Sequence, residues 1–370
     1  MTGLALLLAV LSLRGDGARS AYVRRRLATR TPDDACPAAT VIVPVKGADE
    51  GLRDNLLALA SLDYPDYELI VTARFAADIP AGVAPPRARV VLAGEGDPAT
   101  GEKISNLLAA IAAARPASEI FAFADSDGRV APGWLRALAA PLAEDGVGLS
   151  TGYRWHAPDA GGFWPLLRSA WNAVIAGGFG GANQRFAWGG AMAIRRETFV
   201  SARVAEFWQG TVSDDFRIAH AMRAAKLRIA FAPGAMVAAV DGTGGAEFLG
   251  WIQRQMIITR VYEPALWRIG FLAHAIYCGA MAGAVLAPTR ARIAAVGLIL
   301  GLGMWKGARR GRLMRACLPA QDSYFVRHGW IYTWWTPLVT WVWLYSFAAS
   351  AVTRTIRWRG HVYRLGSPPR

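Results

Sequence analysis

The sequence contains few cysteines, and their placement argues against two kinds of structure. Cys36, Cys278 and Cys317 are odd in number, lie far apart and lack the spacing of metal ligands. A disulfide framework needs paired cysteines, and a zinc site needs closely spaced ligands. We therefore expect neither, and we predict that the three thiols are small apolar fillers in a protein of a reducing compartment.

Acidic residues are scarce relative to basic ones. The chain has 41 Lys and Arg against 27 Asp and Glu, a net charge of +14. This balance suits either a nucleic-acid partner or a membrane protein whose cytosolic edges are rich in arginine. The basic residues stand in clusters beside apolar runs, at 24–26, 309–310 and 354–359, and no nucleic-acid-binding module is recognisable. The composition predicts a membrane partner and no nucleic acid.

Long apolar runs are missing from the first two thirds of the chain and frequent after residue 263. Residues 4–13 are apolar but too few to cross a bilayer, which takes about 20 residues, so we expect a weak anchor or part of a first helix there. Residues 266–286 and 330–352 are each long enough to span, and 294–305 is near the lower limit.

The number of crossings stays open at this point. Three crossings place the basic tail across the membrane from the preceding domain, whereas omitting the short run leaves the basic loop 306–315 on the wrong side. A helix break at Pro337, or an interfacial helix, would relieve the conflict.

Before residue 125, short β-branched runs alternate with helical patterns. The predicted strands are 40–45, 67–72, 89–93 and 119–124, and the predicted helices are 52–62 and 103–114. This alternation predicts an α/β fold with a mainly parallel sheet. Because ligands of such sheets bind beyond the carboxyl ends of the strands, the residues after 45 and after 124 are candidates for a site.

The strongest local feature is Asp125-Ser126-Asp127, directly after a predicted strand. Two carboxylates at this spacing can converge on one divalent cation, and Mg²⁺ or Mn²⁺ prefers carboxylate and phosphate oxygens. Such a cation would stabilise a leaving diphosphate. The alternative is a polar turn, since the sequence Asp-Ser-Asp-Gly also suits a turn. Its position after a buried strand favours the metal site.

A second acidic pair, Asp214-Asp215, follows Ser213 at the start of a helical pattern through 217–225. Ser213 could cap this helix, and carboxylates in a first turn are stabilising. The functional alternative is a general base that removes the proton of an acceptor hydroxyl. The residues alone do not choose between Asp214 and Asp215.

Basic and glycine-rich segments complete the candidate site. Lys46, Lys103 and Arg260 could bind a diphosphate, for which cationic donors are needed, although each alone is commonly a surface charge. The segment 187–192 is aromatic and rich in glycine, which suits close approach of the backbone to a ligand or else a buried bend. We place Trp188, Gly189 and Gly190 on the acceptor side.

Several segments occur in a characteristic order: VIVPVKG, NL, LDYP, KISNL, DSD and SDDF, at 41–47, 55–56, 62–65, 103–107, 125–127 and 213–216. Together they resemble inverting GT-A glycosyltransferases of the family 2 type, most closely ceramide glucosyltransferases and their bacterial relatives. The tail residues 357–360 and Tyr363 resemble a C-terminal element of that group. The resemblance implies a Rossmann-like GT-A domain, a DxD motif at Asp125 and Asp127, and Asp215 as the base.

Two departures from this group affect the predictions. The acid that these enzymes carry after the second strand, near the uracil, is missing, and Asp78 is the nearest one available for donor binding. In the late (Q/R)xxRW motif, Arg260 matches the arginine while Val261 replaces the tryptophan. The incomplete motif favours a single transfer over processive polymer synthesis.

These observations predict an N-terminal weak anchor with a basic linker over 1–37, a GT-A domain over 38–262, and membrane or interfacial helices with a basic tail over 263–370. The predicted function is metal-dependent transfer from a nucleotide-sugar, with UDP as the expected carrier, to a lipid hydroxyl. The expected location is the inner cell membrane with the catalytic domain in the cytoplasm. The alternatives are a processive polysaccharide synthase and a non-catalytic membrane scaffold.

Overall fold

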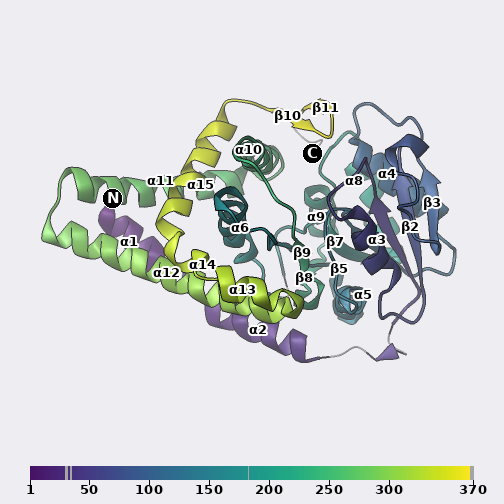
Figure 1. Ribbon diagram of the computed structural model, residues 1–370, viewed down its shortest axis with the longest axis horizontal. Helices are drawn as coiled ribbons and strands as arrows, with labels where there is room; N and C mark the ends of the chain where they lie inside the picture. The colour runs from purple at the N-terminus through teal and green to yellow at the C-terminus, as the bar shows by residue number, and fades with distance from the viewer. Residues whose placement is uncertain (30–31, 34–35, 182, 367–370) are drawn as a thin grey trace. The chain divides into compact units, whose positions relative to one another are not determined.

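The computed structural model describes residues 1–29, 32–33, 36–181 and 183–366. Its contacts divide the chain into two compact units (Figure 1). The α/β unit comprises residues 22–155 and 179–241, and the helical unit comprises 1–21, 156–178 and 242–370. Residues 30–31 and 34–35 of the expected linker, and 367–370 of the expected tail, lie outside the described residues.

The α/β unit is built on a seven-stranded sheet with the order β3-β2-β1-β4-β7-β5-β8. Paired strands are parallel except at β7, which is antiparallel to both β4 and β5. The strands are β1 (Ala39–Pro44), β2 (Tyr67–Ala73), β3 (Ala88–Leu92), β4 (Ile120–Ala124), β5 (Val147–Thr151), β7 (Ala191–Arg195) and β8 (Arg228–Phe231). A separate ribbon pairs β6 (Arg154–His156) with β9 (Val237–Ala239).

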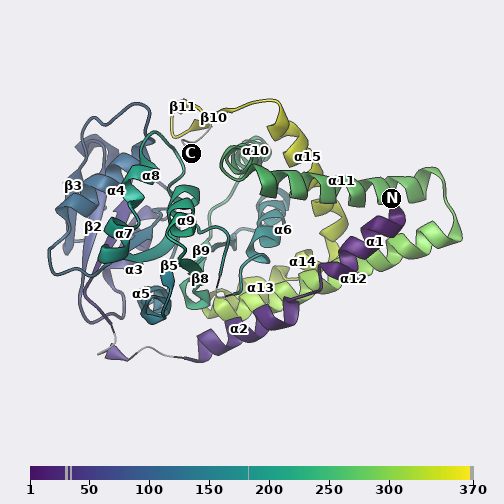
Figure 2. The ribbon, with the colours of Figure 1, turned by 180° about the vertical axis from the view of Figure 1, so that it is seen from behind.

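Helices connect these strands (Figures 1 and 2). They are α3 (Leu52–Ala60), α4 (Glu102–Ala113), α5 (Trp134–Ala139), α7 (Arg196–Ser201), α8 (Val204–Trp208) and α9 (Asp214–Ala224), with 3₁₀ turns η2 (Ala76–Asp78), η3 (Ala140–Ala143) and η4 (Pro233–Ala235). Helix α2 (Asp16–Ala28) begins in the helical unit and ends in the α/β unit. The four strands and two helices predicted before residue 125 are confirmed, with ends shifted by no more than two residues.

The central strands are buried on both faces, which explains their continuous apolar sequence. In β1, Val41 and Val43 face one core cluster while Ile42 belongs to the other, because successive side chains of a strand point to opposite faces. Helices α3 and α5 contribute to the first cluster, and α4 and α9 to the second.

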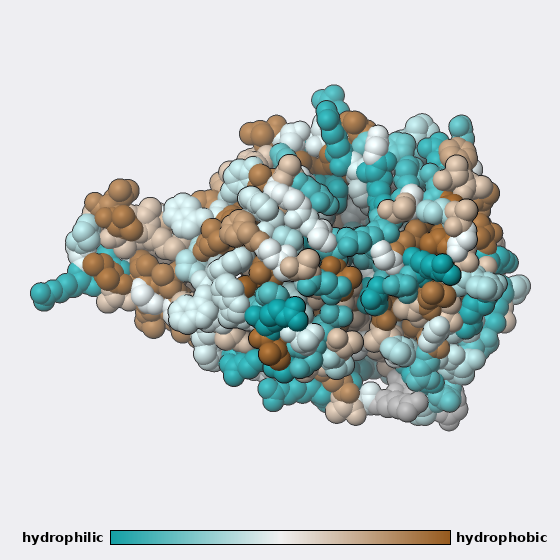
Figure 3. Space-filling view, in the orientation of Figure 1, coloured by the Kyte–Doolittle hydropathy of each residue, from teal (hydrophilic) through white to brown (hydrophobic). Residues whose placement is uncertain are grey.

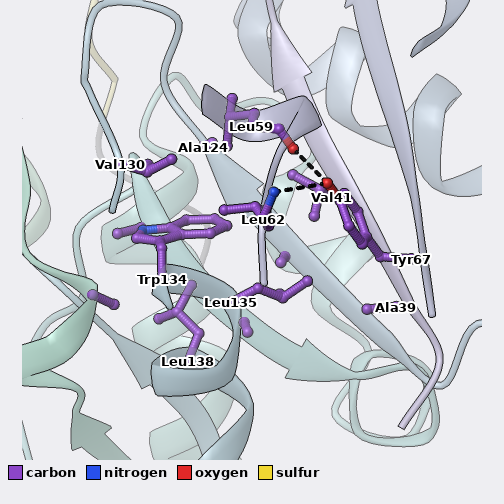
Figure 4. Close-up of a cluster of buried hydrophobic side chains, with 14 of the residues drawn as sticks. Ala39, Val41, Leu59, Leu62, Tyr67, Ala124, Val130, Trp134, Leu135 and Leu138 are labelled. Carbon is purple, nitrogen blue, oxygen red and sulfur yellow. Dashed lines mark hydrogen bonds between the residues drawn. The ribbon is translucent and has the colours of Figure 1, made fainter. Parts of the chain in front are cut away.

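The first cluster packs around Trp134 (Figure 4). Leu135 and Leu138 of α5 lie in the same cluster, as does Tyr67 of β2. The Tyr67 hydroxyl donates to the carbonyl of Leu59 at 3.1 Å and accepts from the amide of Leu62 at 3.0 Å. Each large apolar side chain buried here contributes about 1.5–3 kcal/mol to folding. This packing gives the strand ends a rigid support.

The antiparallel strand β7 determines which segments meet at the functional edge of the sheet. Because β1, β2, β4 and β5 run in one direction, their carboxyl ends share an edge. The opposite direction of β7 brings its amino end, preceded by Trp188-Gly189-Gly190, to that same edge. The segments that follow residues 44, 124 and 151 therefore adjoin this glycine-rich segment.

The helical unit contains α1 (Thr2–Leu11), α6 (Phe163–Ala176), α10 (Gly245–Tyr262), α11 (Pro264–Leu286), α12 (Arg290–Cys317), η5 (Pro319–Gln321), α13 (Asp322–His328), α14 (Ile331–Trp334) and α15 (Thr336–Ala351). Its tail forms a hairpin of β10 (Thr355–Trp358) and β11 (His361–Arg364). The division by contacts groups α6 and α10 with these helices, whereas the sequence-based boundary was placed after residue 262.

Helices α11 and α12 form a hairpin against which α1 packs (Figures 1 and 2). Ala5 and Ala9 of α1 are buried with Ala280 of α11 and Ile299 of α12. Both long helices are apolar enough to cross a membrane, and only 17% and 11% of their apolar windows is buried inside the protein. This exposure, visible as brown surface over the hairpin in Figure 3, differs from that of an ordinary core helix.

Two membrane predictions need correction. The run 330–352 is not one spanning helix, because the chain breaks at Trp335 and α15 begins at Thr336 with Pro337 in its first turn. Helix α15 has 16 residues, or about 24 Å at 1.5 Å per residue, and packs along α10 and α11. The run 294–305, expected to be marginal, instead belongs to the 28-residue helix α12. The α/β class, with a mainly parallel sheet followed by apolar helices, is confirmed.

Candidate active site

The two carboxylates of the DSD segment stand at the end of β4, as predicted. Their loop is held by hydrogen bonds to two neighbouring segments. The Ser126 hydroxyl donates to the carboxylate of Asp49, and the Asn55 side chain donates to the carbonyl of Ser126 at 3.1 Å. Asp49 follows β1 and Asn55 lies in α3, so the segment after β1 holds the loop that carries Asp125 and Asp127.

Arg154 lies between these two carboxylates. Its Nη2 is 3.0 Å from Asp125 Oδ2 and 2.9 Å from Asp127 Oδ1, and its Nη1 is 3.0 Å from Asp127 Oδ2. The guanidinium also lies over the ring of Trp188, 5.0 Å from its centroid. Because one nitrogen contacts both acids, the two carboxylates converge on a single point where a cation is held.

Lys103 joins this acidic pair to the second one. Its Nζ lies 2.9 Å from Asp125 Oδ1, 3.1 Å from Asp214 Oδ2 and 3.4 Å from the carbonyl oxygen of Gly189. Lys103 comes from the first turn of α4 and Asp214 from the first turn of α9. Asp125 and Asp214, which lie far apart in the chain, thus share the ammonium group of Lys103.

The start of α9 orients its two aspartates differently. The Ser213 hydroxyl accepts from the amide of Phe216 at 3.3 Å, which confirms the predicted cap. Asp215 Oδ1 accepts from the same amide at 2.8 Å and from the Ser213 hydroxyl. Asp214 is buried and faces Lys103, whereas Asp215 is partly exposed. Asp215 is therefore the more accessible carboxylate of the pair.

Gly189 and Gly190 allow the backbone to approach the charged groups closely. A methyl group on Gly189 would lie 2.8 Å from Lys103 Nζ, and one on Gly190 would lie 2.6 Å from Asp125 Oδ2. Both distances are too short for carbon, so any larger residue would displace a charged side chain. The backbone of this segment therefore lies close to the protein's own ionic groups and to the Trp188 ring, and its approach to a ligand stays a prediction.

Burial and charge shift the pKa values of the site in opposing directions. Burial raises the pKa of Asp214 to about 6, although Lys103 opposes the shift. Burial also raises the pKa of Asp127 despite the neighbouring Arg154. For Lys103, burial alone would lower the pKa, but Asp125 and Asp214 outweigh it and the net shift is upward. Ionisable groups perturbed by such partners are typical of functional sites.

Three other predicted donor-binding residues have different surroundings. Lys46 pairs with Glu102, the neighbour of Lys103, and the carbonyl of Asp78 accepts from the amide of Gly47 at 2.7 Å. Lys46 and Asp78 therefore lie close together after β1 and β2. Arg260 belongs to the helical unit, where its guanidinium donates to the carbonyls of Ala351, the last residue of α15, and of Thr353. Its role in donor binding stays a prediction.

The two DSD carboxylates have the chemistry and convergence that a hard divalent cation requires. Asp125 and Asp127 offer oxygen ligands to one point, and phosphate oxygens of a donor would complete the coordination. Within the described residues, no group of three or more His, Cys, Asp or Glu side chains is arranged to hold a metal ion. A metal here would therefore depend on its substrate for further ligands.

Arg154 was not among the residues predicted for the site. The sequence feature that could have indicated it is the strand over 147–151, because Arg154 follows the end of that strand after only Gly152 and Tyr153. A methyl group at Gly152 would overlap the backbone of Ala235, so only glycine fits this turn. Once β5 is recognised as parallel to β4, its carboxyl end must reach the edge that holds Asp125.

Comparisons with known proteins place the chain in a family. A family model described as glycosyl transferase family 21 matches residues 4–370. No curated protein sequence matches the chain. Among solved structures, the mannosyltransferase PcManGT from Pyrobaculum calidifontis, in complex with GDP-Man and Mn²⁺, has a TM-score of 0.46 and 17% identity, with 95% of this chain and 98% of that chain covered.

A second solved structure is GalNAc-T7 with UDP, GalNAc and Mn²⁺, which has a TM-score of 0.43 and 14% identity. The match covers 62% of this chain and 48% of that one. At these identities and TM-scores, neither likeness assigns a donor or a metal to this chain.

Proposed function

Because the chain belongs to glycosyl transferase family 21 and is a glycosyltransferase, we propose that it moves one sugar from a nucleotide-sugar to the hydroxyl of a membrane lipid, with inversion at the anomeric carbon. The observation that carries this proposal is the position of Lys103, whose Nζ contacts both Asp125 and Asp214. A donor-binding pair and a candidate base pair therefore belong to one site.

On the donor side, Asp125 and Asp127 would hold Mg²⁺ or Mn²⁺. When bound, this ion would neutralise charge on the leaving diphosphate. Lys46, Lys103 and Asp78 surround the same strand ends and are assigned to the nucleotide and its phosphates. UDP is the proposed carrier, by resemblance to the ceramide glucosyltransferases.

On the acceptor side, Asp215 is the proposed general base. Its carboxylate is partly exposed and is oriented through Oδ1 by the helix start. It would take the proton of the acceptor hydroxyl, whose oxygen attacks the anomeric carbon while the bond to the diphosphate breaks. Asp214 is buried against Lys103 and is better placed to fix that ammonium group. General bases of this kind contribute about 10²–10⁴ in rate.

The α11–α12 hairpin is the proposed membrane anchor. It would cross the inner membrane twice, with the α/β unit on the cytoplasmic side. Helices α11 and α12 pack against each other and both contact α15 within the helical unit, so with two crossings the chain would return to the side that it left. The basic segments 306–315 and 354–359 then lie on one side, as the positive-inside rule requires. A hairpin with two crossings would therefore satisfy the rule for both basic segments.

The proposal is tested by assaying purified full-length protein with radiolabelled UDP-glucose, UDP-galactose, UDP-N-acetylglucosamine and GDP-mannose. Each donor is combined with a lipid extract containing ceramides, with Mn²⁺ or with EDTA. We expect one UDP-sugar to label a single lipid product in the presence of metal, with the opposite anomeric configuration to the donor by NMR. Long polymeric product, retained configuration, or no transfer from any donor would contradict it.

A further inference from the structure

The guanidinium of Arg154 occupies the point at which Asp125 and Asp127 converge. Its two terminal nitrogens make contacts of 2.9–3.0 Å with three of the four carboxylate oxygens. The fourth, Asp125 Oδ1, is held by Lys103. Every oxygen of the DSD pair therefore has a cationic partner supplied by the protein itself, and a metal ligated by this pair must compete with Arg154.

The physical setting makes this contact strong in the free protein. The side chain of Arg154 is 14% exposed, so its pairs with the carboxylates are screened little by water. Asp127 also feels the negative charges of Asp125, Asp49 and Asp241. Without a cation at this point, those charges would repel one another. The ring of Trp188 adds a favourable face for the guanidinium.

We propose that Arg154 is an internal counter-cation that must leave Asp125 and Asp127 before a divalent metal ion binds there. This inference rests on the proposed function and deepens it, because a nucleoside diphosphate offers the displaced guanidinium a new anionic partner. Arginine binds phosphate oxygens through two parallel hydrogen bonds, so the exchange preserves its charge pairing. Metal and nucleotide therefore bind cooperatively, and the free protein has low affinity for the metal alone.

The test measures Mn²⁺ affinity by electron paramagnetic resonance, with purified full-length protein, in the presence and absence of UDP. We expect Arg154→Gln to bind Mn²⁺ alone at least tenfold more tightly than wild type. UDP should increase the affinity for Mn²⁺ in both proteins, but by a factor at least fivefold smaller in Arg154→Gln than in wild type. The reason is that the proposed coupling between the two ligands depends on the displacement of the arginine. Arg154→Lys, which keeps the charge, should stay closer to wild type.

The matched control is Arg115→Gln. Arg115 is also ion-paired, to Asp66 at 2.6 Å, but precedes β4 and so lies at the opposite end of that strand from Asp125. Its Mn²⁺ affinity should equal that of wild type. Circular dichroism, together with retained binding of Mn²⁺ and UDP in combination, establishes that each variant is folded.

The outcomes separate the two proposals. If wild type binds Mn²⁺ and UDP together but Arg154→Gln binds Mn²⁺ alone no more tightly than wild type, the counter-cation inference is wrong and the proposed function stands. If wild type binds neither Mn²⁺ nor UDP under any condition, the proposed metal and donor use is wrong, and the inference falls with it.

Discussion

At the residue scale, the site has fewer cationic groups than carboxylates. Lys103 and Arg154 face Asp125, Asp127 and Asp214, with Asp215 close enough to influence Lys103 electrostatically. The carboxylates outnumber the two cations, so the site is negatively charged when all of its carboxylates are ionised. A divalent cation is the simplest group that would neutralise it.

Asp214 provides a test of this electrostatic account through pH. Its pKa of about 6 exceeds the value of 3.8 expected for the unfolded chain, so between about pH 4 and 6 the folded state binds more protons. Stability from this group is therefore fully present below pH 4 and is lost as pH rises through 6. The loss is on the order of 2–3 kcal/mol.

Denaturant unfolding of wild type and Asp214→Asn from pH 4 to 7 measures this effect. The free energy of unfolding of wild type, minus that of the variant, should fall across the window and level off above pH 7. A difference that is independent of pH would show that Asp214 titrates at its ordinary value.

The local structure around the two acidic pairs was predictable because its signal lies within a few residues. Asp125 and Asp127 follow an apolar strand, and Asp214 and Asp215 follow a capping serine, so each pair is visible within a few residues. Arg154 was missed because its approach to Asp125 depends on β7 inserting between β4 and β5, a pairing of distant segments. Neighbouring residues carry no trace of such a contact.

At the element scale, strands buried on both faces were predictable because apolar β-branched residues run without interruption, as in β1 and β2. The antiparallel direction of β7 was not predictable, since a short strand shows no polarity in its composition. The length of helix α12 was underestimated because its second half is basic. The apolar pattern ends there, although the helix continues to Cys317. The length of helix α15 was overestimated because an apolar run does not show where a helix is interrupted.

The proposal that α11 and α12 cross the membrane twice predicts that the turn between them and the tail are exposed on opposite sides. Two exposed positions suit single cysteine substitutions: Ala287, between α11 and α12, and Thr355, in the tail. In a background lacking Cys36, Cys278 and Cys317, a membrane-impermeant maleimide should label Ala287→Cys in intact spheroplasts and Thr355→Cys only in inside-out vesicles. Labelling of both positions from the same side would contradict two crossings.

At the scale of the whole molecule, one family match spans residues 4–370 and therefore includes both the α/β unit and the helices after it. The α/β unit by itself contains Asp125, Asp127, Lys103 and the α9 aspartates, so the proposed chemistry is complete within that unit. The apolar hairpin belongs to the other unit, and its proposed role is attachment to the membrane. This division of labour fits a transferase whose acceptor is a lipid.

The central claim is that the two acidic pairs serve different steps in one site. Nucleotide affinity and transfer rate, measured side by side for Asp125→Asn and Asp215→Asn, test it most directly. We predict that Asp125→Asn lowers the affinity for UDP with Mn²⁺ at least tenfold. Asp215→Asn should bind UDP within about twofold of wild type while transfer falls by about 10²-fold or more. Full transfer by Asp215→Asn, or unchanged nucleotide affinity in Asp125→Asn, would contradict the account.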